Sequence, residues 1–306
     1  MIYPINFSIP ECKILKHDFN FKKTKFMSPL VPGKLETYIY KSEEDYYKNY
    51  QNCYFGKTTR KAGWDCLRHY EILANGCIPW FEDIEHIPEK TMTRFPKTKI
   101  QSIMELAKYN TIVNETTTLS LYFLKVLDET VNELLEYTRE NLTTKAMARY
   151  VFNCIGIPES VHSTKKILYL SQNLAPDYLR CLMLHGFKEL LGKNCHDYPK
   201  VPHIYKSFPE EESLKIYGKG FTYTRLLDDS ETRDDSLDNI VEDNIKGLVY
   251  DYIVYGSCHR GLPFWDVVNS YYKPDKIILF CGEDLHECQF KKMLADTNYH
   301  LFIREY

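Results

Sequence analysis

The residues best suited to chemistry lie between 57 and 71, where a basic turn leads into an amphipathic segment. Lys57, Arg60 and Lys61 carry positive charge in or beside a polar turn that ends at Gly63. The unpaired N–H groups and the dipole at a helix N-terminus also favour anions. We therefore expect this turn to bind the diphosphate of a nucleotide.

The elements that position the turn are indicated by the flanking residues. Residues 53–57 form a short apolar and aromatic run, which is typical of a strand. From Trp64 to Leu73 apolar residues recur at helical spacing, and Asn75-Gly76 is a common helix end. Residues 77–81 are apolar again and predict a second buried strand. Strand, turn, helix and strand in this order form half of a nucleotide-binding α/β layer.

Arg68 and Glu71 lie three residues apart, on one face of the predicted helix. With Gly76-Cys77-Ile78-Pro79 they form the pattern RHYEILANGCIP, which resembles the donor-binding segment of exostosin-like glycosyltransferases. The resemblance is close over residues 54–83 and loose elsewhere. It implies that Glu71 binds the ribose of a nucleotide sugar, generally a UDP-sugar, and that Arg68 faces the diphosphate. The alternative is an ordinary βαβ unit with a surface Arg–Glu pair.

The expected donor site extends beyond this motif. Residues 40–42 lie where we expect a strand to end and a helix to begin, the rim at which open α/β sheets bind ligands, so Tyr40 is a candidate for base stacking. The predicted donor-binding residues are Tyr40, Ser42, Lys57, Thr58, Arg60, Lys61, Gly63, Trp64, Asp65, Arg68 and Glu71.

Metal-dependent sugar transferases carry an Asp-x-Asp signature, and this chain has none. Its absence favours the GT-B architecture, in which basic side chains and helix dipoles neutralise the leaving diphosphate. We therefore predict no metal and no other cofactor, the nucleotide sugar being a substrate. A divalent cation held by Asp83 and Glu85 is the alternative.

Bulk composition narrows the class of protein. The net charge of −3 argues against a general nucleic-acid binder. The ten cysteines are scattered in mostly apolar surroundings without a C-x-x-C pair, which predicts free thiols in a reducing compartment. The N-terminus lacks a signal-like pattern, and no apolar run approaches the length of a membrane span. Animal exostosins carry a membrane anchor, whereas this chain is expected to have none and to be cytoplasmic.

A chain of 306 residues favours two domains. We predict a donor-binding Rossmann-like domain with a helical extension at 1–157 and an acceptor-binding Rossmann-like domain at 158–306, joined by a linker at 156–164. Strands and helices alternate in both, which predicts an α/β fold with a parallel sheet in each half. The expected strands are 35–40, 53–57, 77–81, 166–171, 201–205, 220–227, 250–256, 276–281 and 300–303. The acidic run at 226–243 is expected to be a solvated loop that leads into a helix.

The order of the halves is unusual for GT-B enzymes, in which the acceptor domain normally comes first. A circular permutation explains this order. It predicts that Met1 and Tyr306 lie close together beside the cleft between the domains. It also predicts that residues 156–164 are the one covalent crossing and that the C-terminal residues form an edge strand.

The general base of the transfer is expected on loops that follow strands of the acceptor domain. The candidate catalytic residues are Asp177, His259, Glu283 and Asp284. Together with the resemblance they predict an inverting transfer from a UDP-sugar, such as UDP-xylose or another UDP-hexose or UDP-pentose, to a hydroxyl of a glycan or glycoprotein. Two alternatives stay open: an NAD-dependent oxidoreductase or epimerase using the glycines at 218 and 220, and a non-catalytic glycan-binding module derived from a transferase.

Overall fold

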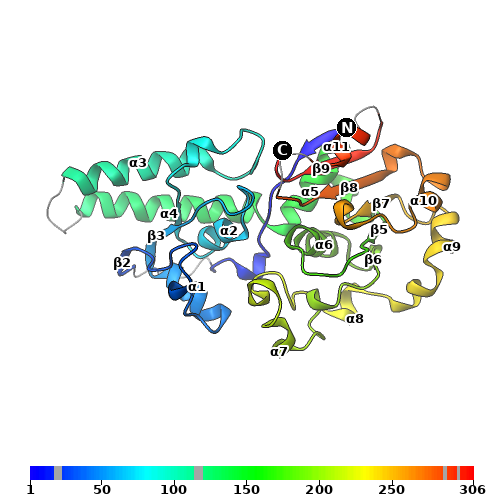
Figure 1. The fold of residues 1–306 in the computed structure, drawn as a ribbon, viewed down its shortest axis with the longest axis horizontal. Helices are drawn as coiled ribbons and strands as arrows, with labels where there is room; N and C mark the ends of the chain where they lie inside the picture. Colours follow the sequence, from blue (N-terminus) through cyan, green and yellow to red (C-terminus); the bar gives the residue numbers. More distant parts are fainter. Residues whose placement is uncertain (17–22, 114–119, 285–287, 295–296) are drawn as a thin grey trace.

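The computed structural model describes residues 1–16, 23–113, 120–284, 288–294 and 297–306. Two lobes lie side by side, each built on its own parallel sheet (Figure 1). The first lobe contains the three-stranded sheet β2-β3-β4 with α1–α4, and the second contains the six-stranded sheet β1-β9-β8-β7-β5-β6 with α5–α11. The predicted α/β class, with a parallel sheet in each half, is confirmed.

The first lobe follows the sequence pattern closely around the basic turn. Its strands are β2 (Lys25–Met27), β3 (Cys53–Lys57) and β4 (Ile78–Trp80), and its helices are α1 (Glu43–Gln51), α2 (Leu67–Ala74), α3 (Lys97–Val113) and α4 (Leu121–Asn141). The Ser42 hydroxyl caps α1 by accepting a hydrogen bond from the Asp45 amide. After α2 the chain turns at Gly76 with φ of 62°, a conformation that favours glycine. Helices α3 and α4 extend away from the second lobe (Figure 1).

In the second lobe, helices cover both faces of the sheet. Its strands are β1 (Ile2–Pro4), β5 (Ile167–Leu170), β6 (Cys195–Tyr198), β7 (Tyr252–Tyr255), β8 (Ile277–Cys281) and β9 (His300–Ile303). Its helices are α5 (Thr144–Cys154), α6 (Tyr178–Leu191), α7 (Glu210–Ser213), α8 (Asp229–Thr232), α9 (Val241–Lys246), α10 (Trp265–Tyr271) and α11 (Phe290–Met293). Alternate residues of β5 enter different core clusters: Tyr169 packs with residues of α5 and α6, and Leu168 packs with residues of α9 and α10. This alternation explains why the strand reads as continuously apolar.

The strand order fixes where a ligand is expected to bind. From β5 the chain adds β6 on one side and then places β7, β8 and β9 in succession on the other. The order reverses at β5, so the connections after β5 and β7 run in opposite directions, which is the point of an open α/β sheet where ligands typically bind. In the second lobe this switch point is the position at which the fold favours a ligand.

The two sheets do not divide the chain at residue 157. Strand β1 pairs with β9 in the second lobe, and α5 already packs against α6 before residue 156 is reached. The lobes are joined by two segments that meet at the bridge between Ile9 and Thr143. The prediction of a single crossing at 156–164 is therefore wrong, because the apolar face of α5 belongs to the second lobe.

The termini lie on neighbouring strands, as the permutation idea requires, but at opposite ends of them. The Met1 amino group donates to the Tyr299 carbonyl 2.6 Å away, at the amino end of β9. Tyr306 lies beyond the carboxyl end of β9, where its hydroxyl is 3.2 Å from the Lys90 amine of the first lobe. Only Tyr306 therefore lies beside the other lobe. The C-terminal strand is not at the sheet edge, because β1 covers it.

Several short predicted strands are wrong. Residues 35–37 and 202–204 are 3₁₀ turns, and residues 205 and 227 form only an isolated bridge. Strands β1, β2 and β6 were not predicted. Prolines and lysines made the region of the first two look like an extended connection, and His196-Asp197 interrupts the apolar pattern of β6. Among the described residues, no helix combines the length and the apolar composition needed to cross a bilayer.

Candidate functional site

The switch point gathers residues from the loops after β5 and β7. Asp177 caps α6, and its Oδ1 accepts a hydrogen bond from the Arg180 amide at 3.0 Å. Its Oδ2 accepts from the Ser257 hydroxyl at 2.6 Å and from Arg260 Nε at 2.8 Å. Burial acts to raise the pKa of Asp177, but Arg180 and these hydrogen bonds outweigh it and lower the pKa. Asp177 is therefore an ionised anchor that joins the two loops.

His259 is the second predicted catalytic residue that the fold brings to this point. Its Nε2 lies 3.7 Å from Asp177 Oδ2, and its Nδ1 is buried without a hydrogen-bond partner among the described residues. Burial lowers the pKa of His259, so the imidazole is neutral near pH 7. The 3.7 Å separation is too long for a hydrogen bond, so the imidazole lies beside the carboxylate without being bonded to it.

The other two predicted catalytic residues face different partners. Asp284 forms an ion pair with the buried Arg304. Glu283 Oε2 lies 3.7 Å from Cys281 Sγ, at the end of β8. Of the four predicted residues, Asp177 and His259 lie together, Glu283 acts electrostatically on His259 from the end of β8, and Asp284 is paired with Arg304.

The predicted ribose-binding Glu71 is buried in the first lobe, with 7% of its surface exposed. It accepts hydrogen bonds from the Tyr46 hydroxyl at 2.6 Å and from the Thr222 hydroxyl at 2.5 Å. Burial raises the pKa of Glu71, and these two hydrogen bonds oppose the shift. Arg68, on the same helix, donates from Nη2 to the Tyr38 hydroxyl at 2.9 Å. Glu71 thus contacts the second lobe through Thr222, and Arg68 is bonded to Tyr38 of its own lobe.

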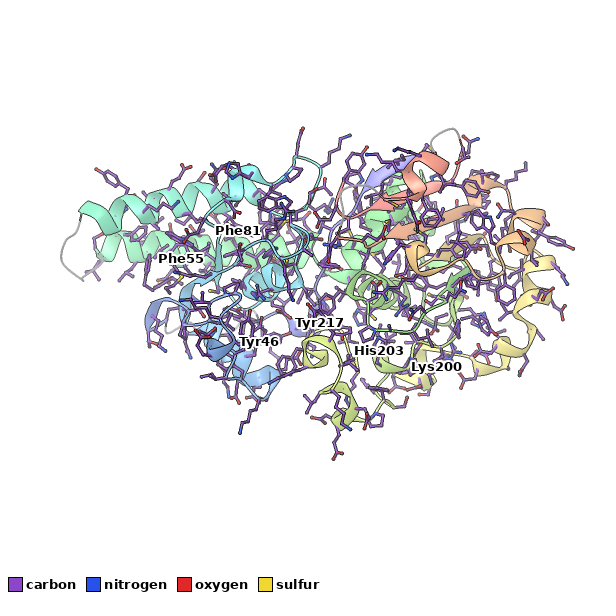
Figure 2. All side chains as sticks on the ribbon, viewed as in Figure 1. Tyr46, Phe55, Phe81, Lys200, His203 and Tyr217 are labelled. Carbon is purple, nitrogen blue, oxygen red and sulfur yellow. The ribbon has the colours of Figure 1, made fainter. Side chains whose placement is uncertain are left out.

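A segment of the second lobe, residues 217–222, lies over this donor side. The Thr222 hydroxyl also contacts the Tyr47 hydroxyl at 2.6 Å, and the Lys219 amine donates to the Tyr40 carbonyl at 2.6 Å. The Lys61 amine donates to the Tyr217 hydroxyl at 2.5 Å. Figure 2 shows Tyr217 at the junction of the two lobes, close to where Tyr46 lies in the first.

The glycines at 218 and 220, considered for a dinucleotide, belong to this same segment. They lie in a 3₁₀ turn with φ of 64° and 66°, not between a strand and a helix. They therefore lack the strand-turn-helix context that binds a dinucleotide diphosphate.

The remaining predicted donor residues divide into exposed and engaged ones. Arg60 lies over the Trp64 ring, 5.3 Å from its centroid. Thr58 is buried, and its hydroxyl lies 2.8 Å from His69 Nδ1. Gly63 is close enough to Glu305 that any side chain there would collide with its carboxylate. The cationic turn itself remains exposed or half-exposed at Lys57, Arg60 and Lys61, and Ser42 serves as a helix cap.

Two residues that the sequence analysis missed hold the turn against the second lobe. Arg304 and Glu305 are each 1% exposed and follow β9 directly. Arg304 Nη1 donates to the Asp65 carbonyl at 2.6 Å, and Glu305 Oε1 accepts from the Asp65 amide at 2.9 Å. Burial raises the pKa of Asp65 to about 7, against the opposing charge of Arg304. The sequence did contain a signal for this contact, because two charged residues directly follow a buried strand.

A surface pocket of about 580 Å³ opens beside the donor side. It is lined in part by Lys13, Glu43, Tyr47 and Asn75. Glu43 Oε1 also accepts a hydrogen bond from the Thr222 amide at 2.5 Å. The pocket therefore adjoins the contact at which the two lobes meet.

All ten cysteines are free, and seven of them are buried, in agreement with the sequence prediction of free thiols. Comparisons of the chain with protein-family models, with curated proteins and with solved structures found no match in any of the three.

Proposed function

We propose that this chain is a glycosyltransferase that transfers a sugar from a UDP-sugar to a glycan or glycoprotein hydroxyl, in a GT-B-like arrangement. The observation that carries the proposal is the facing of two sites across the junction. Glu71 accepts a hydrogen bond from Thr222 of the second lobe, and Lys61 donates to Tyr217, whose ring lies 5.6 Å from the ring of Tyr178, the neighbour of Asp177. The first site has the residues of the exostosin-like donor motif, and the second lies at a topological switch point.

In this proposal His259 is the general base. Its neutral imidazole accepts the proton of the acceptor hydroxyl while the hydroxyl oxygen attacks the anomeric carbon. The bond from that carbon to the diphosphate oxygen breaks, and the electron pair leaves with UDP. Attack from the face opposite the leaving group inverts the anomeric centre. The nearby charge of Asp177 stabilises the imidazolium that forms, and Lys57, Arg60, Lys61 and Arg68 offset the charge of the departing diphosphate.

Thr222 of the second lobe occupies the position at Glu71 that the donor motif assigns to the ribose. Its hydroxyl donates to the Glu71 carboxylate, as a ribose hydroxyl would. Binding of UDP then requires residues 217–222 to leave Glu71, so the lobes separate locally before they close on the nucleotide. A permuted order of the halves fits the pairing of β1 with β9, which places the first and last strands side by side.

Calorimetry with UDP, GDP and CMP tests the donor class, and Glu71→Gln tests the site. Wild-type protein should prefer UDP, and Glu71→Gln should weaken UDP binding at least tenfold, because a hydrogen bond to a charged group contributes about 1.5–3 kcal/mol. Glu129→Gln, an exposed acid on α4, is the control and should bind UDP as wild type. Equal UDP affinity in the Glu71 variant would exclude the ribose assignment.

Transfer is expected to continue in EDTA without added magnesium or manganese, because basic side chains surround the diphosphate position. Sugar transfer is measured with and without the chelator. Activity that EDTA abolishes, and that manganese restores but zinc does not, would instead assign a cation to Asp83 and Glu85.

A further inference from the structure

Three cysteine side chains converge behind the loops of the switch point. Cys258 begins the turn after β7, Cys281 ends β8, and Cys288 lies just before α11. Their Sγ atoms all lie within 4.8 Å of one another. The side chains are 1%, 1% and 3% exposed, respectively. Three cysteines spread over thirty positions of the chain thus direct their sulfur atoms at one buried point.

Ordinary packing does not account for this arrangement. A single buried thiol behaves as a small apolar group, and Cys195 in β6 and Cys53 in β3 are examples. Among the described residues, Cys258, Cys281 and Cys288 are the one group of three or more potential ligands that meets in this way. None of the three is in a disulfide.

We propose that Cys258, Cys281 and Cys288 bind a zinc ion as three thiolate ligands. Zinc takes Cys sulfur at about 2.3 Å in a tetrahedral site, which separates neighbouring sulfurs by about 3.8 Å. The observed limit of 4.8 Å requires only small side-chain shifts to reach that spacing. Thiolates are soft ligands, so the set selects zinc over magnesium, calcium or manganese. Each thiol releases its proton to solvent when the ion binds.

Glu283 is the candidate fourth ligand, and its side chain must turn toward the ion, because its carboxylate oxygens do not lie within 4.8 Å of all three sulfur atoms. Its Oε2 lies 3.7 Å from Cys281 Sγ. A carboxylate oxygen at about 2.0–2.2 Å from zinc lies about 3.5 Å from a neighbouring sulfur ligand in a tetrahedral site. The four ligands then close the coordination sphere, which is the arrangement of a structural site and not of a catalytic one.

The ion would tie together the segments that follow β7 and β8. Cys258 directly precedes His259, and Glu283 directly precedes Asp284, which pairs with Arg304. Zinc at this point fixes the backbone from which His259 projects. The site does not depend on the proposed sugar transfer, since its ligands do not include the donor residues.

The test is the metal content and cobalt spectrum of the full chain, purified under reducing conditions. One zinc per chain by mass spectrometry is expected. Cobalt added to the metal-free protein should give a near-ultraviolet charge-transfer band from three thiolates. Cys288→Ser should lose the bound metal, and Cys195→Ser, a buried cysteine outside the cluster, should retain it. Glu283→Gln should keep the cobalt band and bind zinc at least tenfold more weakly.

Three outcomes would overturn the site. One is wild-type protein that neither contains zinc nor gives a thiolate–cobalt band. Another is a disulfide between two of the three cysteines in protein purified without reductant. If the Cys288 variant does not fold, the wild-type protein is titrated with a mercurial instead, and zinc should be released as three thiols react. The third contradicting outcome is zinc release without modification of these thiols. Equal zinc affinity in Glu283→Gln removes Glu283 from the site. UDP binding is measured separately, so failure of the zinc site leaves the transferase proposal intact.

Discussion

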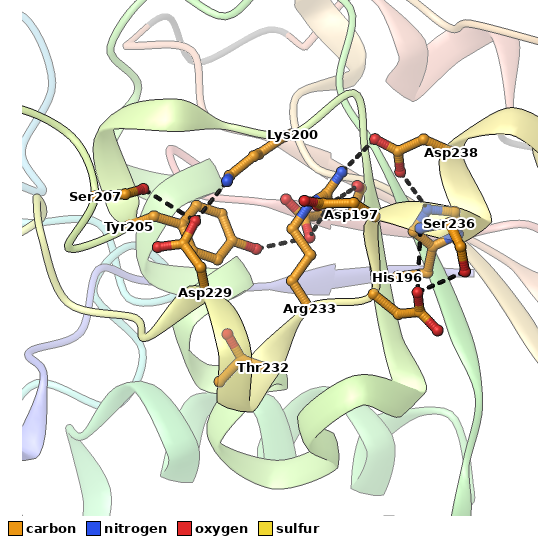
Figure 3. A network of polar contacts seen from close by, with 12 residues as sticks. His196, Asp197, Lys200, Tyr205, Ser207, Asp229, Thr232, Arg233, Ser236 and Asp238 are labelled. Carbon is orange, nitrogen blue, oxygen red and sulfur yellow. Dashed lines mark hydrogen bonds and ion pairs between the residues drawn. The ribbon is translucent and has the colours of Figure 1, made fainter.

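Two buried arginines organise polar networks in this protein, one within a lobe and one between the lobes. Arg233 lies inside the second lobe, where its Nη1 donates to Asp197 Oδ1 at 2.8 Å (Figure 3). Asp197 also pairs with the Lys188 amine at 2.9 Å and accepts from the Tyr205 hydroxyl at 2.7 Å. Arg233 further pairs with Asp238 and Asp235. Every charge in this network has a partner.

The network of Arg304 lies at the junction and is less completely paired. Arg304 contacts Glu305, Asp284 and the Asp65 carbonyl. Glu305 Oε2 is nevertheless buried without a hydrogen-bond partner among the described residues, and the pKa of Asp65 is raised by burial to about 7. A fully paired buried network fixes one geometry, whereas a partly paired one costs free energy that opening can recover. The difference indicates that, of these two networks, the one at the junction is the easier to open.

The largest effect is expected from breaking the network within the lobe. Asp197→Ala leaves the buried charges of Lys188 and Arg233 without their shared carboxylate. Removing one partner of a buried ion pair costs about 3–5 kcal/mol in the free energy of unfolding. Asp235→Ala is the matched control, because Asp235 also pairs with Arg233 but its side chain is 76% exposed, so the cost should be below about 1 kcal/mol. Urea denaturation measures both, and equal costs would mean that burial does not set the value of these pairs.

The junction network should make stability depend on pH. Because the pKa of Asp65 is raised to about 7 in the folded protein, the folded state binds more protons than the unfolded state between about pH 4 and 7. The contribution of Asp65 to the free energy of unfolding therefore falls as pH rises through this window, by up to about 1.4 kcal/mol per pH unit. Asp65→Asn should remove this decline, and the exposed Asp243→Asn should not. Urea denaturation from pH 5 to 8 measures the slopes, and parallel curves for wild type and Asp65→Asn would contradict the assignment.

The smallest effect is expected at the outer contact between the lobes. Thr222→Val removes the hydroxyl that occupies Glu71 while keeping the shape of the side chain. Since a hydrogen bond to a carboxylate contributes about 1.5–3 kcal/mol and UDP must displace this one, UDP affinity should rise at least tenfold. Thr130→Val on α4, whose hydroxyl bonds the Val126 carbonyl within its own helix, is the control. Weaker UDP binding in Thr222→Val would show that Thr222 supports the nucleotide instead of competing with it.

The local elements of this protein were largely determined by its sequence. Strands β3, β5, β7 and β8 and helix α2 with its glycine stop follow from short apolar runs, helical spacing and capping residues, all of which act within a few residues. Asp177 and His259 were predicted for the same reason, since each follows a recognisable strand and parallel strands end at one edge. Strand β6 was missed because His196 and Asp197 look exposed until Asp238 and Arg233 pair with them.

Only the tertiary structure decided how distant residues meet. Thr222 reaches Glu71 across 151 positions in the chain, and Asp65 reaches Arg304 across 239. The three cysteines converge because β7 and β8 are neighbours, which no spacing in the sequence indicates. Such contacts depend on the order of strands and the seating of one lobe on the other. Local sequence patterns do not indicate the strand order or the seating of the lobes, because these contacts form only after both lobes have folded.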